Sequence, residues 1–297
     1  MSTSTSAEKV TPAPAGERLP ATRTRAVTSG TAGSSADRRV QPPSGPTPTT
    51  GRTVAFSRSR QSVRELVRFS EKVPAIPQLR RASIPRLTAV RAAATVKVSW
   101  PILFFKAYGR VCARHPQLRQ VYVRWPWTRL YEHAVPVGRM TLSRPINGED
   151  WLFLTKVSEP GEVPLTALDD DLRQMRFGSG AEVDLVSRQE RFAKVPAFLK
   201  RLGFLSMLWS GRWRTMWLGT YGVTTVSKFG AVTLRPPVFN TTMLSFGPVS
   251  ADGAVDIVLT YDHRVIDGAL NAQAMAELEE ELETHIADEL EALQPAG

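Results

Sequence analysis

Apolar positions recur with a helical period at several points of the chain, and short extended runs separate them. In the run SRSRQSVRELVRFSEKVPAIPQ, Val63, Leu66 and Val67 share one helical face, which predicts a helix that ends at Pro74. The run SWPILFFKAYGRVCARHPQLR predicts a second helix, stopped by its His-Pro pair. Between them, the extended stretch RRASIPRLTAV predicts an early strand.

Strand-like runs dominate the next part of the chain. The runs VYVRW, LYEHAVPVGRM and WLFLTKV alternate with Pro and Gly turns, which is typical of sheet strands. A helix is predicted from Leu165, because three aspartates favour its N-terminal end. Further on, a hairpin through Asp252-Gly253 leads into the alternating strand AVDIVLTY. The last run, ALNAQAMAELEEELETHIADELEAL, has one broad apolar face and predicts a docking helix.

Composition separates a tail from a folded domain. Residues 1–51 are rich in Ser, Thr, Pro, Ala, Gly and Arg, so they cannot bury enough surface to offset the entropy of ordering. We therefore expect a disordered tail over 1–51 and one domain over 52–297. The net charge of +10 suggests nucleic acid or a membrane as partner, but much of the excess lies in the tail and in surface-like segments, which favours a solvated basic face.

The single cysteine, Cys112, excludes an internal disulfide framework and a Cys-based zinc cluster. No apolar run approaches the ~20 residues that span a bilayer, and the N-terminus lacks the hydrophobic centre of a secretory signal. These features predict a soluble, cytoplasmic protein.

The candidate chemistry lies in LTYDHRVIDGAL, residues 259–270, between the last strand and the last helix. A histidine there has a rigid backbone on both sides, so the imidazole of His263 can be aimed at a substrate as a general base. The spacing His-x-x-x-Asp is short, and alone it fits an ordinary surface turn equally well. The other histidines, His115, His133 and His285, lie on unrelated elements, so no metal site is predicted.

Taken whole, DHRVIDGA resembles the catalytic signature of the dihydrolipoyl acyltransferases, the core subunits of 2-oxoacid dehydrogenase complexes, which share a fold with chloramphenicol acetyltransferase. A second string, GTYGVTTVSKFG, aligns without a gap with that family's Gly-Thr-Phe-Thr-Ile-Ser/Thr-Asn-x-Gly. Thr225 stands where Asn is usual, and Ser227 where Gly is usual. The resemblance covers roughly residues 54–293 and implies an α+β, chloramphenicol acetyltransferase-like two-layer fold, with a mixed β-sheet covered by helices.

The resemblance also implies roles for individual residues. His263 would remove the proton from a coenzyme A or dihydrolipoyl thiol, and the Thr224 hydroxyl would stabilise the oxyanion. Asp267 would be structural and pair with an arginine, either Arg60 or Arg264, to hold the turn in which Gly268 lies.

Partners follow from the same resemblance. It implies coenzyme A as a substrate and no metal, together with a homotrimer, or cages of trimers, in which His263 faces Thr224 of the neighbouring subunit. No lipoyl domain precedes the catalytic region, so the lipoyl group would come from another protein, such as a 2-oxoacid dehydrogenase component, or the acceptor would differ.

The segment from residue 186 to 218 is both basic and aromatic. We expect a pair of amphipathic helices there that form a wall of the substrate channel. The residues expected to pack into the domain or a subunit interface are Phe198, Leu202, Leu205, Leu208 and Trp209.

Two alternatives remain open. One is a non-catalytic scaffold of the same fold that binds a partner, nucleic acid or membrane through this basic Trp-rich segment. The other is condensation-type chemistry on carrier-bound substrates, which usually shows a second histidine where this chain has Asp262.

Overall fold

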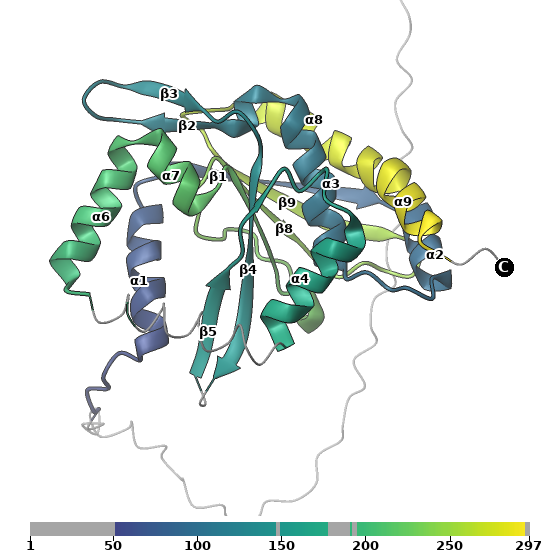
Figure 1. Ribbon diagram of the computed structural model, residues 1–297, viewed down its shortest axis with the longest axis horizontal. Coiled ribbons are helices and arrows are strands. Elements are labelled where there is room, and N and C mark those ends of the chain that lie inside the picture. The colour runs from purple at the N-terminus through teal and green to yellow at the C-terminus, as the bar shows by residue number, and fades with distance from the viewer. Residues whose placement is uncertain (1–50, 147–148, 178–190, 192–194, 295–297) are drawn as a thin grey trace, which may run out of the picture. The chain divides into compact units, whose positions relative to one another are not determined.

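A mixed β-sheet organises the part of the chain that the structure describes, which is residues 51–146, 149–177, 191 and 195–294 of the computed structural model. The strand order is β1-β9-β8-β7-β4-β5, with the short strand β6 paired to β4 (Figure 1). The bounds are β1 Ala75–Ser83, β4 Val137–Ile146, β5 Glu149–Leu154, β6 Val157–Ser158, β7 Tyr221–Thr225, β8 Thr242–Phe246 and β9 Ala254–Asp262. Strand β7 runs parallel to β4 and β8, and the other pairs are antiparallel. A separate hairpin joins β2 Gln120–Val123 to β3 Arg129–Glu132.

By its internal contacts the chain divides into Met1–Thr53 and Val54–Gly297, and every helix and strand described here belongs to the second unit. The predicted tail of residues 1–51 falls almost entirely outside the described residues.

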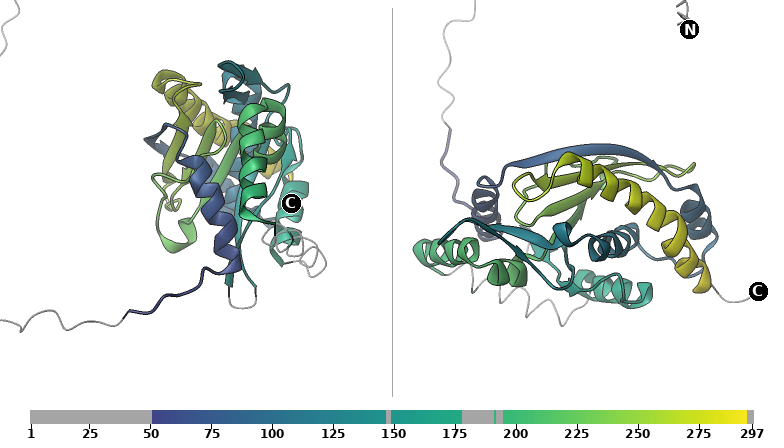
Figure 2. Two further views of the ribbon diagram at one scale, coloured as in Figure 1. Left: turned by 90° about the vertical axis from the view of Figure 1, so that its left-hand side faces the viewer. Right: turned by 90° about the horizontal axis from the view of Figure 1, so that it is seen from above.

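One face of the sheet is covered by two long helices, α3 and α8, with shorter helices beside them (Figure 2). The bounds are α2 Pro85–Ala93, α3 Trp100–Arg114, α4 Leu165–Phe177, α8 Gly268–Glu281 and α9 Ala287–Ala292, with a π-helical turn over Leu282–Ile286. Phe104 of α3 stacks on Phe246 of β8, with ring centroids 4.1 Å apart. A Cβ on Gly138 of β4 would lie 2.5 Å from the Phe105 ring, so the close approach of α3 to the sheet requires glycine there.

A second group of helices reaches the opposite face. It consists of α1 Arg58–Ser70, α6 Ala197–Trp209 and α7 Gly211–Leu218. On β8, Leu244 joins the core under α3, whereas its neighbour Met243 joins a smaller cluster with Phe69 and Leu218. Because successive strand residues point to opposite faces, β8 is covered on both sides.

The expected strand over residues 80–90 is only partly correct. Strand β1 ends at Ser83, and the sequence PRLTAVRAA forms α2 with Pro85 in its first turn. Proline suits that position because its fixed φ fits the helix and its missing N–H would have had no partner there. The helices predicted around Val63, before the His-Pro pair, from Leu165 and at the C-terminus all form.

The basic aromatic segment does contain two helices, α6 and α7, but the packing expected within the domain is wrong for much of it. Phe198, Leu202 and Trp209 are 68%, 56% and 41% exposed in this chain. Leu208 packs against the smaller cluster as expected, and so does Phe204, which was not among the expected residues. Packing of the exposed residues at a subunit interface stays a prediction.

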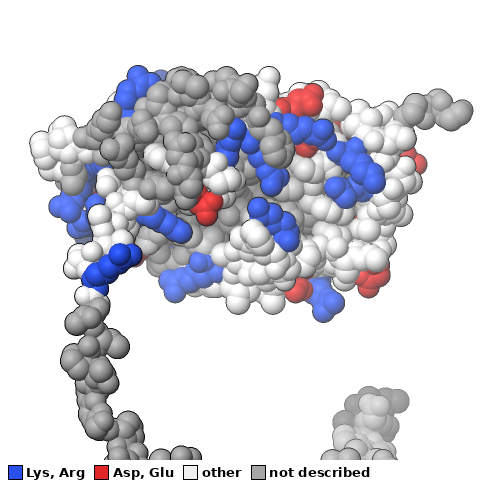
Figure 3. Space-filling model, turned by 90° about the horizontal axis from the view of Figure 1, so that it is seen from below, with Lys and Arg blue, Asp and Glu red and all other residues white. Residues whose placement is uncertain are grey.

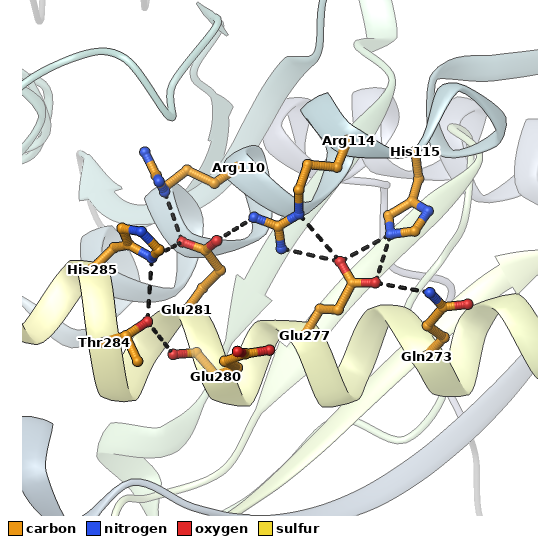
Figure 4. Close-up of polar contacts among 9 residues, drawn as sticks. All are labelled: Arg110, Arg114, His115, Gln273, Glu277, Glu280, Glu281, Thr284 and His285. Atoms are coloured by element: carbon orange, nitrogen blue, oxygen red, sulfur yellow. Dashed lines mark hydrogen bonds and ion pairs between the residues drawn. The ribbon is translucent and has the colours of Figure 1, made fainter.

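An ion-pair network fastens α8 to α3 (Figure 4). Glu281, almost fully buried, accepts from Arg110 Nε at 2.7 Å and also pairs with Arg114. Glu277 meets Arg114 and His115, whose Nε2 lies 2.8 Å from its Oε1. Burial by itself would raise the pKa of Glu281, but the hydrogen bonds from Arg110 and Arg114 outweigh it and leave that pKa below its ordinary value.

This network predicts an acid-sensitive contribution to stability. Because the pKa of Glu281 is depressed in the folded chain, its contribution is present above the ordinary value of 4.5 and is lost as pH falls through the folded value. We expect Glu281→Gln to lower the free energy of unfolding by ~1–3 kcal/mol at pH 7, measured by urea denaturation. The deficit should shrink as pH falls from 4.5 through the folded-state pKa.

The control is Glu280→Gln, which makes the same charge change at an exposed position of the same helix. An equal loss in both variants, or a deficit of Glu281→Gln that is the same at pH 7 and pH 3, would contradict the assignment.

Candidate functional site

The candidate base lies in a tight turn between β9 and α8. The backbone N–H of His263 donates to Pro74 O at 3.2 Å, and the N–H groups of Val265 and Ile266 donate to Asp262 O. The imidazole Nδ1 lies 3.1 Å from Ile266 O. A carbonyl oxygen only accepts, so Nδ1 carries the proton and the neutral ring leaves the Nε2 lone pair free.

The ring of His263 is supported on one side and open on another. Tyr261, which is buried, meets it edge-on with ring centroids 5.5 Å apart. His263 itself is exposed. The imidazole is therefore oriented by its neighbours and remains accessible to a substrate.

The residue before the histidine anchors the turn. Asp262 is fully buried, and its carboxylate accepts from Arg264 Nε at 2.8 Å and from Arg264 Nη2 at 2.6 Å. The guanidinium of Arg264 lies 4.3 Å from the centroid of the Tyr122 ring and also donates to Lys72 O. This bidentate pair closes the turn around His263 without contacting its imidazole ring.

A second arginine, which the sequence analysis did not single out, lies behind this pair. Arg214 of α7 is 1% exposed and donates to Tyr122 O at 2.9 Å and to Phe239 O at 3.2 Å. Burial lowers its pKa to about 10, and the charge of Asp262 acts in the opposite direction. Arg214 therefore remains a cation at neutral pH. Its only sequence signal is a charged position inside the apolar run RWRTMWL.

Asp267 and Gly268 begin the following helix. The Asp267 carboxylate accepts from Leu270 N at 2.9 Å, which makes it the N-cap of α8, and Gly268 is the first helical residue. Among the contacts of the described residues, Asp267 pairs with neither Arg60 nor Arg264. Arg60 is exposed on α1, and its backbone N–H donates to Ser57 Oγ. The expected ion pair is therefore absent within one chain.

The candidate oxyanion residue lies near the end of β7. Thr224 is half-buried, and its side chain has no hydrogen-bond partner among the described residues. The β4–β7 ladder ends at Val223, one residue before it. Thr225, which departs from the family string, donates to Phe246 O at 2.9 Å and accepts from Ser227 N at 3.1 Å. Thr225 thus closes the turn after the strand, while the Thr224 hydroxyl is left available.

The sheet register keeps His263 and Thr224 apart within one chain. Thr224 is level with Ser245 on β8, and Ser245 is level with Val258 on β9. His263 lies five residues further along than Val258, which is ~16 Å, and two strand spacings add ~10 Å sideways, so the two residues are about 19 Å apart. One subunit cannot bring both side chains to one reacting group.

Two surface hollows lie away from both residues. One, of about 480 Å³, is lined by residues of α1 that include Arg60 and Arg64. The other, of about 150 Å³, lies between α1 and α6. His263 and Thr224 line neither hollow.

The remaining reactive groups have other roles. Burial raises the pKa of the Cys112 thiol, so Cys112 stays protonated and is a poor nucleophile. His115 pairs with Glu277, His133 Nδ1 contacts Val135 O at 2.8 Å, and His285 is exposed on the last helix. Within the described ranges, no group of three or more His, Cys, Asp or Glu side chains is placed to hold a metal ion.

Solved acyltransferase cores share this fold. The cubic core of a pyruvate dehydrogenase multienzyme complex matches with a TM-score of 0.60 and 19% identity, over 83% of this chain and 98% of that one. A probable dihydrolipoamide acetyltransferase from Listeria monocytogenes matches with a TM-score of 0.57 and 14% identity, over 79% and 95%. A catalytic core of the 2-oxoacid dehydrogenase multienzyme complex from Thermoplasma acidophilum matches with a TM-score of 0.54 and 14% identity, over 79% and 99%.

No protein-family model and no curated protein sequence matches this chain. The expected α+β fold, with a mixed sheet covered by helices and the architecture of these acyltransferase cores, is confirmed.

The cap role of Asp267 makes a specific prediction. Asparagine caps helices as well as aspartate does, whereas alanine does not. If capping is the main role, Asp267→Ala should cost about 1 kcal/mol of unfolding free energy and Asp267→Asn much less, both measured by denaturant titration.

Arg60→Gln serves as the control. If Asp267 relies on an ion pair with Arg60 in the assembled protein, Asp267→Asn and Arg60→Gln should each cost as much as Asp267→Ala, and the cap assignment would then be insufficient.

Proposed function

We propose that this protein is an acyltransferase that moves an acyl group between thiols, with His263 as the general base. The observation that carries the proposal is the geometry of His263. Its Nδ1–H donates to Ile266 O, its Nε2 has no partner among the described residues, and it follows directly after β9, an inner strand of a sheet with the fold of acyltransferase cores.

The proposed reaction requires only that His263 is correctly positioned to accept a proton and return it. Nε2 accepts the proton of the incoming thiol, and the thiolate attacks the carbonyl carbon of the thioester to form a new C–S bond. The tetrahedral intermediate then breaks its original C–S bond. The departing thiolate takes the proton back from the imidazolium, so atoms and charges balance. The Ile266 carbonyl, which faces Nδ1–H, favours the positive charge that the ring carries between these steps.

Thr224 is the proposed oxyanion donor, and it belongs to a different subunit from the histidine. The free hydroxyl of Thr224 and the separation of about 19 Å within one chain support this arrangement. A symmetric trimer would form each site from His263 of one subunit and Thr224 of the next.

Coenzyme A is the proposed thiol on one side of the exchange. The acceptor on the other side is a dihydrolipoyl group, supplied by another protein such as a 2-oxoacid dehydrogenase component, or a different thiol. The names of the similar structures, a dihydrolipoamide acetyltransferase among them, support this class of substrates.

Replacement of His263 tests the proposal. We expect His263→Ala to lower kcat for thioester exchange between acetyl-coenzyme A and dihydrolipoamide by ~10²–10⁴, the usual contribution of a general base. The matched control is His285→Ala, which removes an exposed histidine from the π-helical turn after α8 and should leave the rate unchanged.

Two outcomes would refute the proposal. The first is full activity of His263→Ala. The second is a folded wild-type protein that exchanges no thioester with any acyl-coenzyme A offered, which would favour the non-catalytic scaffold.

The shared site makes a second prediction. Thr224→Val removes the hydroxyl at nearly constant shape and should lower kcat by ~10²–10³, whereas Thr224→Ser should keep most of it. When His263→Ala and Thr224→Val chains are mixed and reassembled, about a quarter of the sites in randomly mixed trimers should regain both side chains. The rate of thioester exchange by the mixture measures this recovery. Mixed particles that recover no activity would contradict a shared site.

A further inference from the structure

A stripe of exposed apolar residues runs along α6 and, after the extended residue Ser210, along α7. Its members recur at helical spacing, and they are Phe198, Leu202, Leu205, Trp209, Trp213, Met216 and Trp217. Trp213 and Trp217 are 52% and 53% exposed, and Phe198 is 68% exposed. Apolar residues at this spacing are the pattern of a face that is buried against something. No described residue of this chain covers them to that extent.

The opposite side of α6 already has a partner. Phe204 and Leu208 pack on the smaller core cluster, and the rings of Phe204 and Phe69 of α1 lie 5.8 Å apart. The outward stripe is therefore additional to the face that attaches α6 to the domain. Stability of the fold alone does not account for it.

The tip of the β2–β3 hairpin extends the stripe. Trp125 and Trp127 are 56% and 68% exposed, and the Trp125 ring lies 5.2 Å from that of Trp209. Arg129 links the two elements, because its Nη2 donates to Trp209 O. We call the stripe and these two tryptophans together the Trp surface. It holds five of the seven tryptophans of the chain.

The surroundings of the Trp surface are basic. Neither residues 197–218 nor residues 120–131 contain an Asp or Glu. Arg124, Arg201 and Arg212 are exposed among the apolar residues. Beside them, α1 presents Arg60, Arg64 and Arg68 one helical turn apart.

Charged and apolar side chains line one hollow between α1 and α6, where Arg68, Lys72 and Arg201 outnumber the single carboxylate of Glu65 and lie beside Leu205 and Leu208. On the face that is seen from below, Lys and Arg side chains also cover more of the described surface than Asp and Glu side chains do (Figure 3).

We propose that the Trp surface docks the protein onto the surface of an anionic lipid bilayer. Tryptophan rings suit the boundary between headgroups and acyl chains, and arginines around them meet lipid phosphates. The described helices include none with the length and apolar character of a bilayer span. Helices α6 and α7, of 13 and 8 residues, would instead lie in the plane of the interface.

Two other occupants fit the surface less well. Nucleic acid would use the arginines and tryptophans, but it has no use for the aliphatic part of the stripe. A second copy of this chain would bring together two faces on which Lys and Arg outnumber Asp and Glu, so like charges would repel.

The test uses the full-length protein and vesicles, with co-sedimentation and tryptophan fluorescence as readouts. We expect binding to phosphatidylglycerol-containing vesicles, with a blue shift of the emission, and weak binding to pure phosphatidylcholine. Trp213→Ser with Trp217→Ser should weaken binding at least about tenfold, whereas Leu79→Ser, an exposed leucine on β1 that is outside the Trp surface, should not. Arg201→Gln with Arg212→Gln should weaken binding about 30-fold at low salt and reduce its salt dependence.

Three results would overturn the proposal. The first is the absence of vesicle binding, and the second is vesicle binding that the tryptophan pair does not affect. The third is iodide quenching, without lipid, that finds these tryptophans shielded in concentrated protein and accessible after dilution. A second copy of the chain would then occupy the surface. Nucleic-acid binding that depends on the same residues, without vesicle binding, belongs to the first result. None of these readouts uses thioester exchange, so they test the membrane proposal independently of the proposed function.

Discussion

The position of the candidate base depends on one buried ion pair at the end of β9. The carboxylate of Asp262 is fully buried, and a buried carboxylate without a partner would cost several kcal/mol. Arg264, two residues later in the turn, donates to both carboxylate oxygens. His263 lies inside this turn, with its backbone tied to Pro74 and its ring tied to Ile266. The ion pair thus stabilises the turn, and the contacts with Pro74 and Ile266 orient the histidine within it.

The second constraint is the register of the sheet. Strand β9 pairs antiparallel with β8, and β8 pairs parallel with β7. This register places Thr224 and His263 toward opposite ends of the strands. Side chains cannot bridge that separation, so catalysis that uses both residues requires a second copy. The Thr224 hydroxyl has no hydrogen-bond partner among the described residues, which leaves it available to a group from another subunit.

The sequence predicted the fold well where local and long-range preferences agree. The strand AVDIVLTY, the polar turn after it and the helix that follows were predicted from alternation, turn residues and a helical apolar face, and all of them form. The cap role of Asp267 was not predicted, because the resemblance implied an ion pair with an arginine instead. It predicted less well where the outcome depends on distant partners. Ile84 and Pro85 end a strand because the backbone packs there against Gly253, far along the chain. Arg214 is buried because Tyr122 and Phe239 offer it carbonyl groups, which no local pattern reveals.

The most direct test of the central claim is the distance between His263 Nε2 of one subunit and Thr224 Oγ1 of its neighbour in an experimental structure of the assembled protein. A thioester under attack between a base and an oxyanion donor requires about 5–8 Å between those two atoms, and we expect a value in that range across a subunit interface. If the assembled, active protein keeps His263 more than about 15 Å from every Thr224, these two residues do not share a site and the account is wrong.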